Sequence, residues 1–389
     1  MKNQTYLRIL LLIIVFLFYA CETEKVSTNV IESSSLKMKQ MGEVYHFNAP
    51  IYDISSAPDG SIMVGLNDGE DRSIQIIKNG KVSKIIGLES QTDIQGISTI
   101  GSGNAFITTG GTDLAMNGEL YRISNGGTRM VADLAAFERN YDPDAMEGIQ
   151  WKNQLCEAID GFSAGPQNNP FKVTAVSGEE VLVADAAGNS VLSAKTTGEI
   201  DWKAILTPPL DNSGEFMVRW YAGESEDIQC YAQPVPTSIA IGPEGNVFVG
   251  ELIGALSEAD GVFPIGRSRV WKINKDAMNV VLNEKVTSED YEVLIEGLTS
   301  VIDIEIGPDG LLYVVEFDET SWFASFIPNV ASGGTITAYD LEGNLVMQVA
   351  SGLEFPSAIT FDKKGNLWLL QNNNTYWVTG NMPTVRKLQ

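Results

Sequence analysis

One short pattern recurs six times along the chain and limits the folds that it can adopt. In each copy, a run rich in β-branched or aromatic residues leads into a tight turn containing glycine, and a second such run follows. The copies lie at 54–64, 97–107, 173–183, 239–249, 304–314 and 359–369. Because glycine, proline and polar residues favour tight turns, and the alternating apolar residues have the period of a strand, each copy is predicted to be a β-hairpin.

The order of these hairpins predicts a closed ring of sheets. Each of the first five copies is followed by another pair of β-rich runs, such as 73–77 and 82–86 after the first. Four strands per repeat are typical of the blades of a β-propeller. The sixth copy supplies only three strands, the last at 384–388, and a β-rich stretch at 43–47 precedes the first blade. We therefore predict an all-β, six-bladed β-propeller of four-stranded antiparallel blades, in which the N-terminal strand closes the last blade.

The beginning of the chain predicts export. Two basic residues precede an apolar run at 9–18, and Ala20-Cys21 follows. This order is typical of a secretory signal peptide, and the apolar run is too short for a membrane-spanning helix. A cysteine directly after a small residue is similar to the lipobox of bacterial lipoproteins, which implies a lipid on Cys21. The expected parts are a signal peptide at 1–20, a flexible tether at 21–41 and the propeller at 42–389. We expect the protein in the bacterial cell envelope, lipid-anchored at the outer membrane or the periplasmic face.

Charge and composition exclude several classes of function. The chain has 26 Lys and Arg against 50 Asp and Glu, a net charge of -24, which repels nucleic acids and anionic lipid headgroups. We therefore expect no nucleic acid partner, and membrane contact only through the lipid anchor. One histidine and three cysteines cannot form multi-histidine, zinc-ribbon or iron–sulfur sites. A quinone-dependent sugar dehydrogenase would be expected to use a histidine base at the channel. The single histidine, His46, falls in the predicted outer closing strand, so this function is disfavoured as well.

Several longer motifs resemble a known family. They lie at 131–140 with the following Asp142-Pro143, at 234–239 running into 250–252, at 269–273 and at 297–303. On these residues the chain resembles the ScyD/ScyE family of exported propellers with NHL-like repeats. The resemblance implies export and a propeller fold, and it implies no settled biochemical activity.

The insertions predict which face of the propeller is functional. The long ones at 139–170, 207–234, 253–267 and 318–333 fall in connections that share one face, here called the loop face. An insertion at 275–289 is the exception and is predicted to lie on the opposite side. Aligning the six hairpins gives one position on each innermost strand, occupied by Asp53, Gly96, Lys172, Ser238, Asp303 and Ala358. A second position, where the second strand reaches the loop face, is occupied by Leu66, Thr109, Asp185, Glu251, Glu316 and Gln371.

Carboxylates converging on the channel mouth suggest two kinds of role. They can bind Ca²⁺ or act as an acid/base pair, or they can cap strand ends by accepting backbone N–H bonds. The candidate metal ligands are Asp53, Asp303, Glu251 and Glu316. The candidate ligand-binding residues are Asp185, Glu251, Glu316, Gln371, Trp322 and Lys172. The negative charges of these four candidate metal ligands repel one another at the channel mouth. A bound cation, a raised pKa of one carboxyl group, or Lys172 as counter-charge would each relieve this repulsion. Trp322 lies in an aromatic loop that either covers the channel or packs on a neighbouring blade.

Two functions remain open at this point. The first is an exported, membrane-tethered propeller that binds a small molecule, glycan or partner protein at its loop face. The alternative is a Ca²⁺-dependent hydrolase or lactonase resembling the gluconolactonase and paraoxonase propellers. Lys172 at an inner position departs from the carboxylate and amide pattern of those lactonases, and dependence on calcium separates the two functions.

Two cysteines are placed for a disulfide. Cys156 and Cys230 fall in the connections that enter two consecutive blades on the same face. Because an exported protein meets an oxidising compartment, we predict a disulfide between them. Two independent thiols are the alternative.

Overall fold

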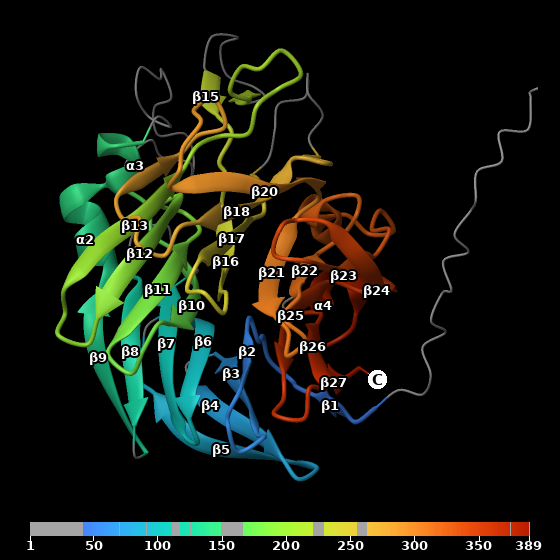
Figure 1. Cartoon of the computed structure of the whole chain (residues 1–389). Helices are drawn as coiled ribbons and strands as arrows, with labels where there is room; N and C mark the ends of the chain where they lie inside the picture. The colour runs from blue at the N-terminus through green and yellow to red at the C-terminus, as the bar shows by residue number, and fades with distance from the viewer. Residues whose placement is uncertain are drawn as a thin grey trace, which may run out of the picture. The chain divides into compact units, whose positions relative to one another are not determined.

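The predicted six-bladed β-propeller is confirmed. The computed structural model describes residues 42–388, apart from 70, 91, 111–116, 125, 149–165, 221–228, 255–262 and 374. These residues belong to one unit of the chain, Gln40–Gln389, in which six sheets form a ring (Figure 1). Their innermost strands pack beside one another around the central axis, which is here called the channel. The predicted signal peptide, the tether and Cys21 lie outside the described residues and stay predictions. Among the helices of the described segments, none is both long and apolar enough to cross a membrane.

The first three blades follow one another along the chain. Blade 1 consists of β2 (Ile54–Ser56), β3 (Ile62–Asp68), β4 (Asp71–Lys78) and β5 (Lys81–Leu88). Blade 2 consists of β6 (Asp93–Gly101), β7 (Asn104–Gly110), β8 (Glu119–Ser124) and β9 (Gly127–Asp133). Blade 3 consists of β10 (Pro170–Ala175), β11 (Glu180–Asp185), β12 (Ser190–Lys195) and β13 (Ile200–Leu206).

The last three blades complete the ring. Blade 4 consists of β16 (Pro236–Ile241), β17 (Val247–Glu251), β18 (Ser268–Ile273) and β20 (Tyr291–Leu298). Blade 5 consists of β21 (Val301–Ile306), β22 (Leu312–Glu316), β23 (Gly334–Tyr339) and β24 (Leu345–Leu353). Blade 6 consists of β25 (Pro356–Phe361), β26 (Leu367–Gln371), β27 (Thr384–Lys387) and β1 (Val44–His46).

The remaining elements lie in the connections between strands. They are α2 (Leu134–Tyr141), α3 (Pro143–Met146), β14 (Val218–Trp220), β15 (Gln229–Tyr231), β19 (Val280–Leu282), η1 (Trp322–Phe326) and α4 (Tyr376–Thr379). β14 and β15 pair as a short hairpin. In the predicted disulfide, Cys156 lies outside the described residues and the side chain of Cys230 in β15 is not described, so the pairing stays a prediction.

The N-terminal strand closes the ring as predicted. β1 pairs antiparallel with β27, with Val44 opposite Arg386 and His46 opposite Thr384. Between them, Tyr45 stacks on Trp368 of β26 with ring centroids 6.1 Å apart. The first and last strands of the propeller therefore share one sheet, and β27 is not left as an open edge.

Apolar side chains fill each space between neighbouring blades. Both faces of a blade are covered, so its middle strands are apolar at successive positions. In β3, Ile62 and Val64 pack toward blade 6, whereas Met63 points the other way and packs toward blade 2. All three are fully buried, and each contributes about 1.5–3 kcal/mol through removal of its apolar surface from water.

One strand departs from the predicted pattern. β19, in the connection between β18 and β20, leaves blade 4 and pairs in parallel with the outer edge of β13 in blade 3. Lys203 of β13 donates hydrogen bonds to the carbonyl oxygens of Ala277 (2.7 Å) and Lys275 (3.2 Å) of this connection. The insertion therefore covers the edge of the neighbouring blade.

Candidate functional site

Three of the predicted inner residues meet in the central channel. Asp53 directly precedes β2, Lys172 lies in β10 and Asp303 lies in β21, the innermost strands of blades 1, 3 and 5. Lys172 Nζ donates a hydrogen bond to Asp53 Oδ1 at 2.7 Å and lies 2.9 Å from Asp303 Oδ1. None of the three is more than 7% exposed. Alternate blades are thus joined by one buried group, here called the channel triad.

The two carboxylates of the triad also bind the blades beside them. Asp53 Oδ2 accepts a hydrogen bond from the backbone N–H of Ile97 in blade 2, at 2.9 Å. Asp303 Oδ2 accepts one from the backbone N–H of Ile359 in blade 6, at 2.8 Å. The triad therefore connects five of the six blades.

Burial and charge set the protonation of the triad. Burial raises the pKa of Asp53 to about 6, against the opposing effect of the Lys172 ammonium. For Lys172, burial favours the neutral form, but Asp303, Asp53 and Glu305 outweigh it and hold its pKa above the ordinary value. Lys172 therefore stays charged at neutral pH. It can then act as the counter-charge of the two carboxylates, as the third of the predicted alternatives requires.

The channel residues do not fit a calcium ion. A Ca²⁺ ion there would need the oxygens of Asp53 and Asp303, and these are held by the Lys172 ammonium. An ammonium at hydrogen-bond distance from both carboxylates supplies the positive charge and repels a second cation.

Glu251 has a separate, buried partner. It forms an ion pair with Arg269 of β18, with Nη2 and Oε2 3.0 Å apart, and accepts a hydrogen bond from Trp271 Nε1 at 3.2 Å. Arg269 also pairs with Glu284 and donates to the carbonyl oxygen of Thr207 at 2.7 Å. Burial raises the pKa of Glu251 to about 7, opposed by Arg269. The structure does not bring Glu251 onto the channel triad.

The other predicted loop-face residues accept or donate bonds within the loops. Glu316 accepts a hydrogen bond from the backbone N–H of Thr299 (2.6 Å). Asp185 accepts one from the backbone N–H of Asn169 (2.7 Å). Gln371 donates one to the carbonyl oxygen of Glu354 (3.0 Å). These are the contacts expected of residues that cap strand ends. Ligand binding by Asp185, Glu316 and Gln371 stays a prediction.

Trp322 is anchored to blade 4 by the backbone. Its indole N–H donates to the carbonyl oxygen of Ile253 at 2.8 Å, and its ring stacks on Phe323 with centroids 4.0 Å apart. Phe326, at the end of the same helix η1, is 52% exposed. One side of this aromatic loop therefore packs on the neighbouring blade, and the other faces solvent.

Glu305 is a channel residue that the sequence alignment missed. It follows Asp303 by two residues on β21, and it is half-buried. Burial raises its pKa to about 8, opposed by Lys172 and reinforced by Asp303 and Asp53. Among the described residues no hydrogen bond to its carboxylate is present. The sequence did offer a signal for Glu305. Side chains two residues apart on a strand point to the same side, so Glu305 was expected on the same side of β21 as Asp303.

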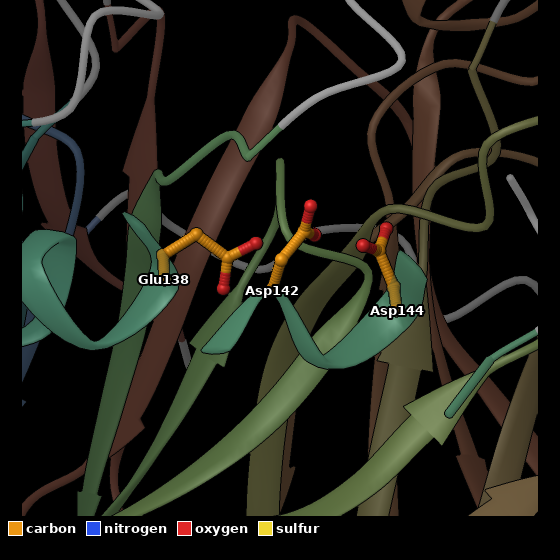
Figure 2. A group of neighbouring side chains, drawn as sticks. All are labelled: Glu138, Asp142 and Asp144. Atoms are coloured by element: carbon orange, nitrogen blue, oxygen red, sulfur yellow. The ribbon is translucent and has the colours of Figure 1, made fainter. Parts of the chain in front are cut away.

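A second acidic group lies in the connection from blade 2 to blade 3. α2 begins at Asp133, whose side chain accepts from the N–H of Ala136 (2.8 Å), and ends at Asp142. Carboxylate oxygens of Glu138, Asp142 and Asp144 lie within 4.8 Å of one another, and Figure 2 shows the Glu138 side chain extending toward Asp142. Burial, reinforced by nearby carboxylates, raises the pKa of Glu138 to about 11.

The sequence reasoning did not single out these three carboxylates. The motif at 131–140 with Asp142-Pro143 served only for the family resemblance. The available signal was the closeness of the three acids in the sequence, with Glu138 and Asp144 on either side of Asp142-Pro143.

The comparisons with known proteins support the fold alone. No protein-family model and no curated protein matches the chain. Among solved structures, the chain is similar to an oxidoreductase (glucose dehydrogenase) of Thermus thermophilus, with 13% identity, TM-score 0.51, and 89% of this chain and 99% of that chain covered. It is also similar to a gluconolactonase of Xanthomonas campestris, with 10% identity, TM-score 0.51, and 89% and 88% covered. The class of protein that these comparisons support is therefore the six-bladed β-propeller.

Proposed function

We propose that this protein is a hydrolase of small cyclic esters, with Lys172 and Glu305 of the channel as its reacting groups. The observation that supports this is the carboxylate of Glu305, which is half-buried, has a raised pKa and lies near a buried ammonium. Titratable groups whose pKa values are perturbed by burial and by a charged partner are typical of catalytic sites. The propeller of the same fold that is named a gluconolactonase supplies the first substrates to test, sugar lactones.

Lys172 would stabilise the negative charge that develops during the reaction. An ammonium has three N–H donors; Lys172 donates one to Asp53, and Asp303 lies beside it as an ion-pair partner. A further donor is available for the carbonyl oxygen of an ester. When water adds to the carbonyl carbon, that oxygen becomes an oxyanion, and a fixed positive charge beside it lowers the barrier.

Glu305 would move the proton. Its ionised carboxylate takes a proton from the attacking water as the new C–O bond forms. The ring C–O bond then breaks, and Glu305 returns the proton to the departing alkoxide oxygen, which yields the hydroxy acid. No step uses a metal ion in the channel.

Rates with sugar lactones test this function. Proton release is followed for the full chain, for Glu305→Gln and for Glu342→Gln, whose carboxylate is exposed in a surface turn. We expect Glu305→Gln to lower kcat by about 100-fold or more and Glu342→Gln to leave it unchanged. In the parent protein kcat/KM should rise with pH through about 8, because the base form of Glu305 is required. Equal rates in the parent and Glu305→Gln, with both folded by thermal melting, would reject the proposal.

Binding without turnover is the second candidate. The exposed ring of Phe326 beside the anchored Trp322 favours it, because aromatic side chains at the loop face offer a surface for a small molecule or glycan. Saturable binding of lactones or glycans, without any product from the parent protein, would support this candidate in place of hydrolysis.

Export and lipid anchoring are part of the proposal. They rest on the apolar run and Cys21, and membership of the ScyD/ScyE family rests on the motifs at 131–140 and 234–239. Labelled palmitate should be incorporated by the parent protein and lost in Cys21→Ser. Incorporation that survives the substitution would reject the anchor.

A further inference from the structure

We propose that Glu138, Asp142 and Asp144 form a calcium site in the connection between blades 2 and 3. This site lies outside the channel and does not depend on the proposed hydrolase. Calcium is the expected ion because all three ligands are carboxylates, the hard oxygen donors that it prefers.

The backbone of α2 and α3 brings the three carboxylates together. Glu138 lies in the last turn of α2, and Asp142 ends that helix in the left-handed region, with φ 50°. Pro143 then begins α3, and Asp144 follows in its first turn. The chain therefore turns sharply at Asp142, so acids on both sides of the turn face one point (Figure 2).

Glu138 lacks the partners that a buried carboxylate needs. It is 0% exposed, and neither of its carboxylate oxygens has a hydrogen-bonding partner among the described residues. The backbone N–H of Gln167 lies close to the Glu138 carboxylate and opposes the rise in the pKa of Glu138. Its geometry is not that of a hydrogen bond. Asp142 Oδ1 is buried and unpartnered as well. Buried polar groups are rarely left without partners, so this carboxylate is aimed at a group that binds from outside the chain.

Glu138 and Asp142 are not neutralised by a basic side chain of the described residues. In the part of the chain that the structure describes, neither Glu138 nor Asp142 forms an ion pair, and the neighbouring Arg139 pairs with Asp133 at 3.8 Å. The carboxylate of Asp185 adds further repulsion to Glu138. A divalent cation would remove this repulsion and satisfy the unpartnered oxygens together.

The spacing of the oxygens suits calcium. One oxygen from each residue lies within 4.8 Å of the other two. Ca–O distances of about 2.3–2.6 Å allow oxygens at such separations to bind one ion, and the irregular coordination that Ca²⁺ accepts suits ligands on two short helices better than the strict octahedron of Mg²⁺. Asn189 orients one ligand, because its Nδ2 donates to Asp144 Oδ2 at 2.9 Å. Asn189 follows β11 in blade 3, so the ion would tie α3 to that blade.

Calorimetric titration of the full chain with Ca²⁺ alone tests the site. The proteins are the parent, Glu138→Gln, Asp142→Asn and the surface control Glu342→Gln, each first freed of metal with a chelator. We expect one saturable binding event in the parent and the control, and a loss of affinity of about 100-fold or more in both site variants. Mg²⁺ should bind more weakly than Ca²⁺.

Thermal melting separates loss of the site from loss of the fold. In chelator, Glu138→Gln should melt no lower than the parent, because a neutral amide replaces a buried carboxylate. In Ca²⁺ the parent should melt higher, by linkage, and the variant should not. No calcium binding in the parent at millimolar concentration would overturn the proposal, as would parent-like affinity in folded Glu138→Gln. Preference for Mg²⁺ would overturn the assignment to calcium. Calcium binding is measured directly, so a failure of the proposed lactone hydrolysis would leave the proposal of a calcium site unaffected.

Discussion

Replacing Lys172 with methionine should destabilise the propeller and make its stability strongly dependent on pH. Methionine fills a similar volume but leaves Asp53 and Asp303, each at most 3% exposed, without their counter-charge. Removing one partner of a buried ion pair costs about 3–5 kcal/mol, and two carboxylates lose theirs here, so we expect the upper end, about 5 kcal/mol near pH 8. For roughly 350 residues this corresponds to a fall in Tm of about 7 °C.

The loss should shrink in acid. Burial already raises the pKa of Asp53 to about 6 in the parent, above its ordinary value, and removal of Lys172 should raise it further. The folded state then binds more protons than the unfolded state between about pH 4 and that raised pKa, so stability increases as pH falls through this window. At pH 5 the deficit of Lys172→Met should therefore be clearly smaller than at pH 8.

Urea unfolding followed by tryptophan fluorescence at pH 8 and pH 5 measures both effects. Lys203→Met is the matched control, because Lys203 is also buried but donates to the backbone carbonyl oxygens of Ala277 and Lys275. Its deficit should not shrink in acid. A Lys172→Met protein as stable as the parent at pH 8, or with the same deficit at both pH values, would refute the role of Lys172 as counter-charge.

Three further predictions concern other parts of the fold. Arg269→Met should lower the free energy of unfolding in urea by about 3–5 kcal/mol, because Glu251 stays buried without its ion-pair partner. The double variant Arg269→Met/Glu251→Gln should regain part of this stability, and additive losses would contradict the pairing. Truncation after Pro383 removes β27 and should lower Tm and promote aggregation, measured by light scattering; an unchanged Tm would contradict closure by this strand. Alkylation of unreduced, denatured protein should modify neither Cys156 nor Cys230 if they form a disulfide, and modification of both would end that prediction.

The fold was predictable because its signals are local. Each hairpin depends on a glycine turn and on alternation within a few residues, and both are visible in segments such as 304–314. The same alignment placed Asp53, Lys172 and Asp303 at equivalent inner positions, and the structure brings these three side chains together. β19 was not predictable in this way, because a strand of three residues depends on the edge of β13 to which it pairs.

The candidate sites were less predictable because partners come from elsewhere in the chain. Glu251 stands at the position equivalent to Glu316, yet Arg269 on the neighbouring strand β18 binds it, whereas backbone N–H and hydroxyl groups bind Glu316. An alignment of repeats cannot show that difference. The acids of α2 and α3 converge only because Asp142 takes a left-handed conformation, which the sequence permits for aspartate but does not require.

The pairing of β1 with β27 has a consequence for how the chain folds during synthesis. Val44 and its partner Arg386 are far apart in the sequence, so Arg386 is synthesised long after Val44. The sixth sheet therefore cannot be completed before β27 has been synthesised, and until then the outer edge of the unfinished blade can pair with other chains. Closing so long a loop is also entropically slow. Final ring closure is thus a late step in maturation, and a chain held unfinished is the form most exposed to misassembly.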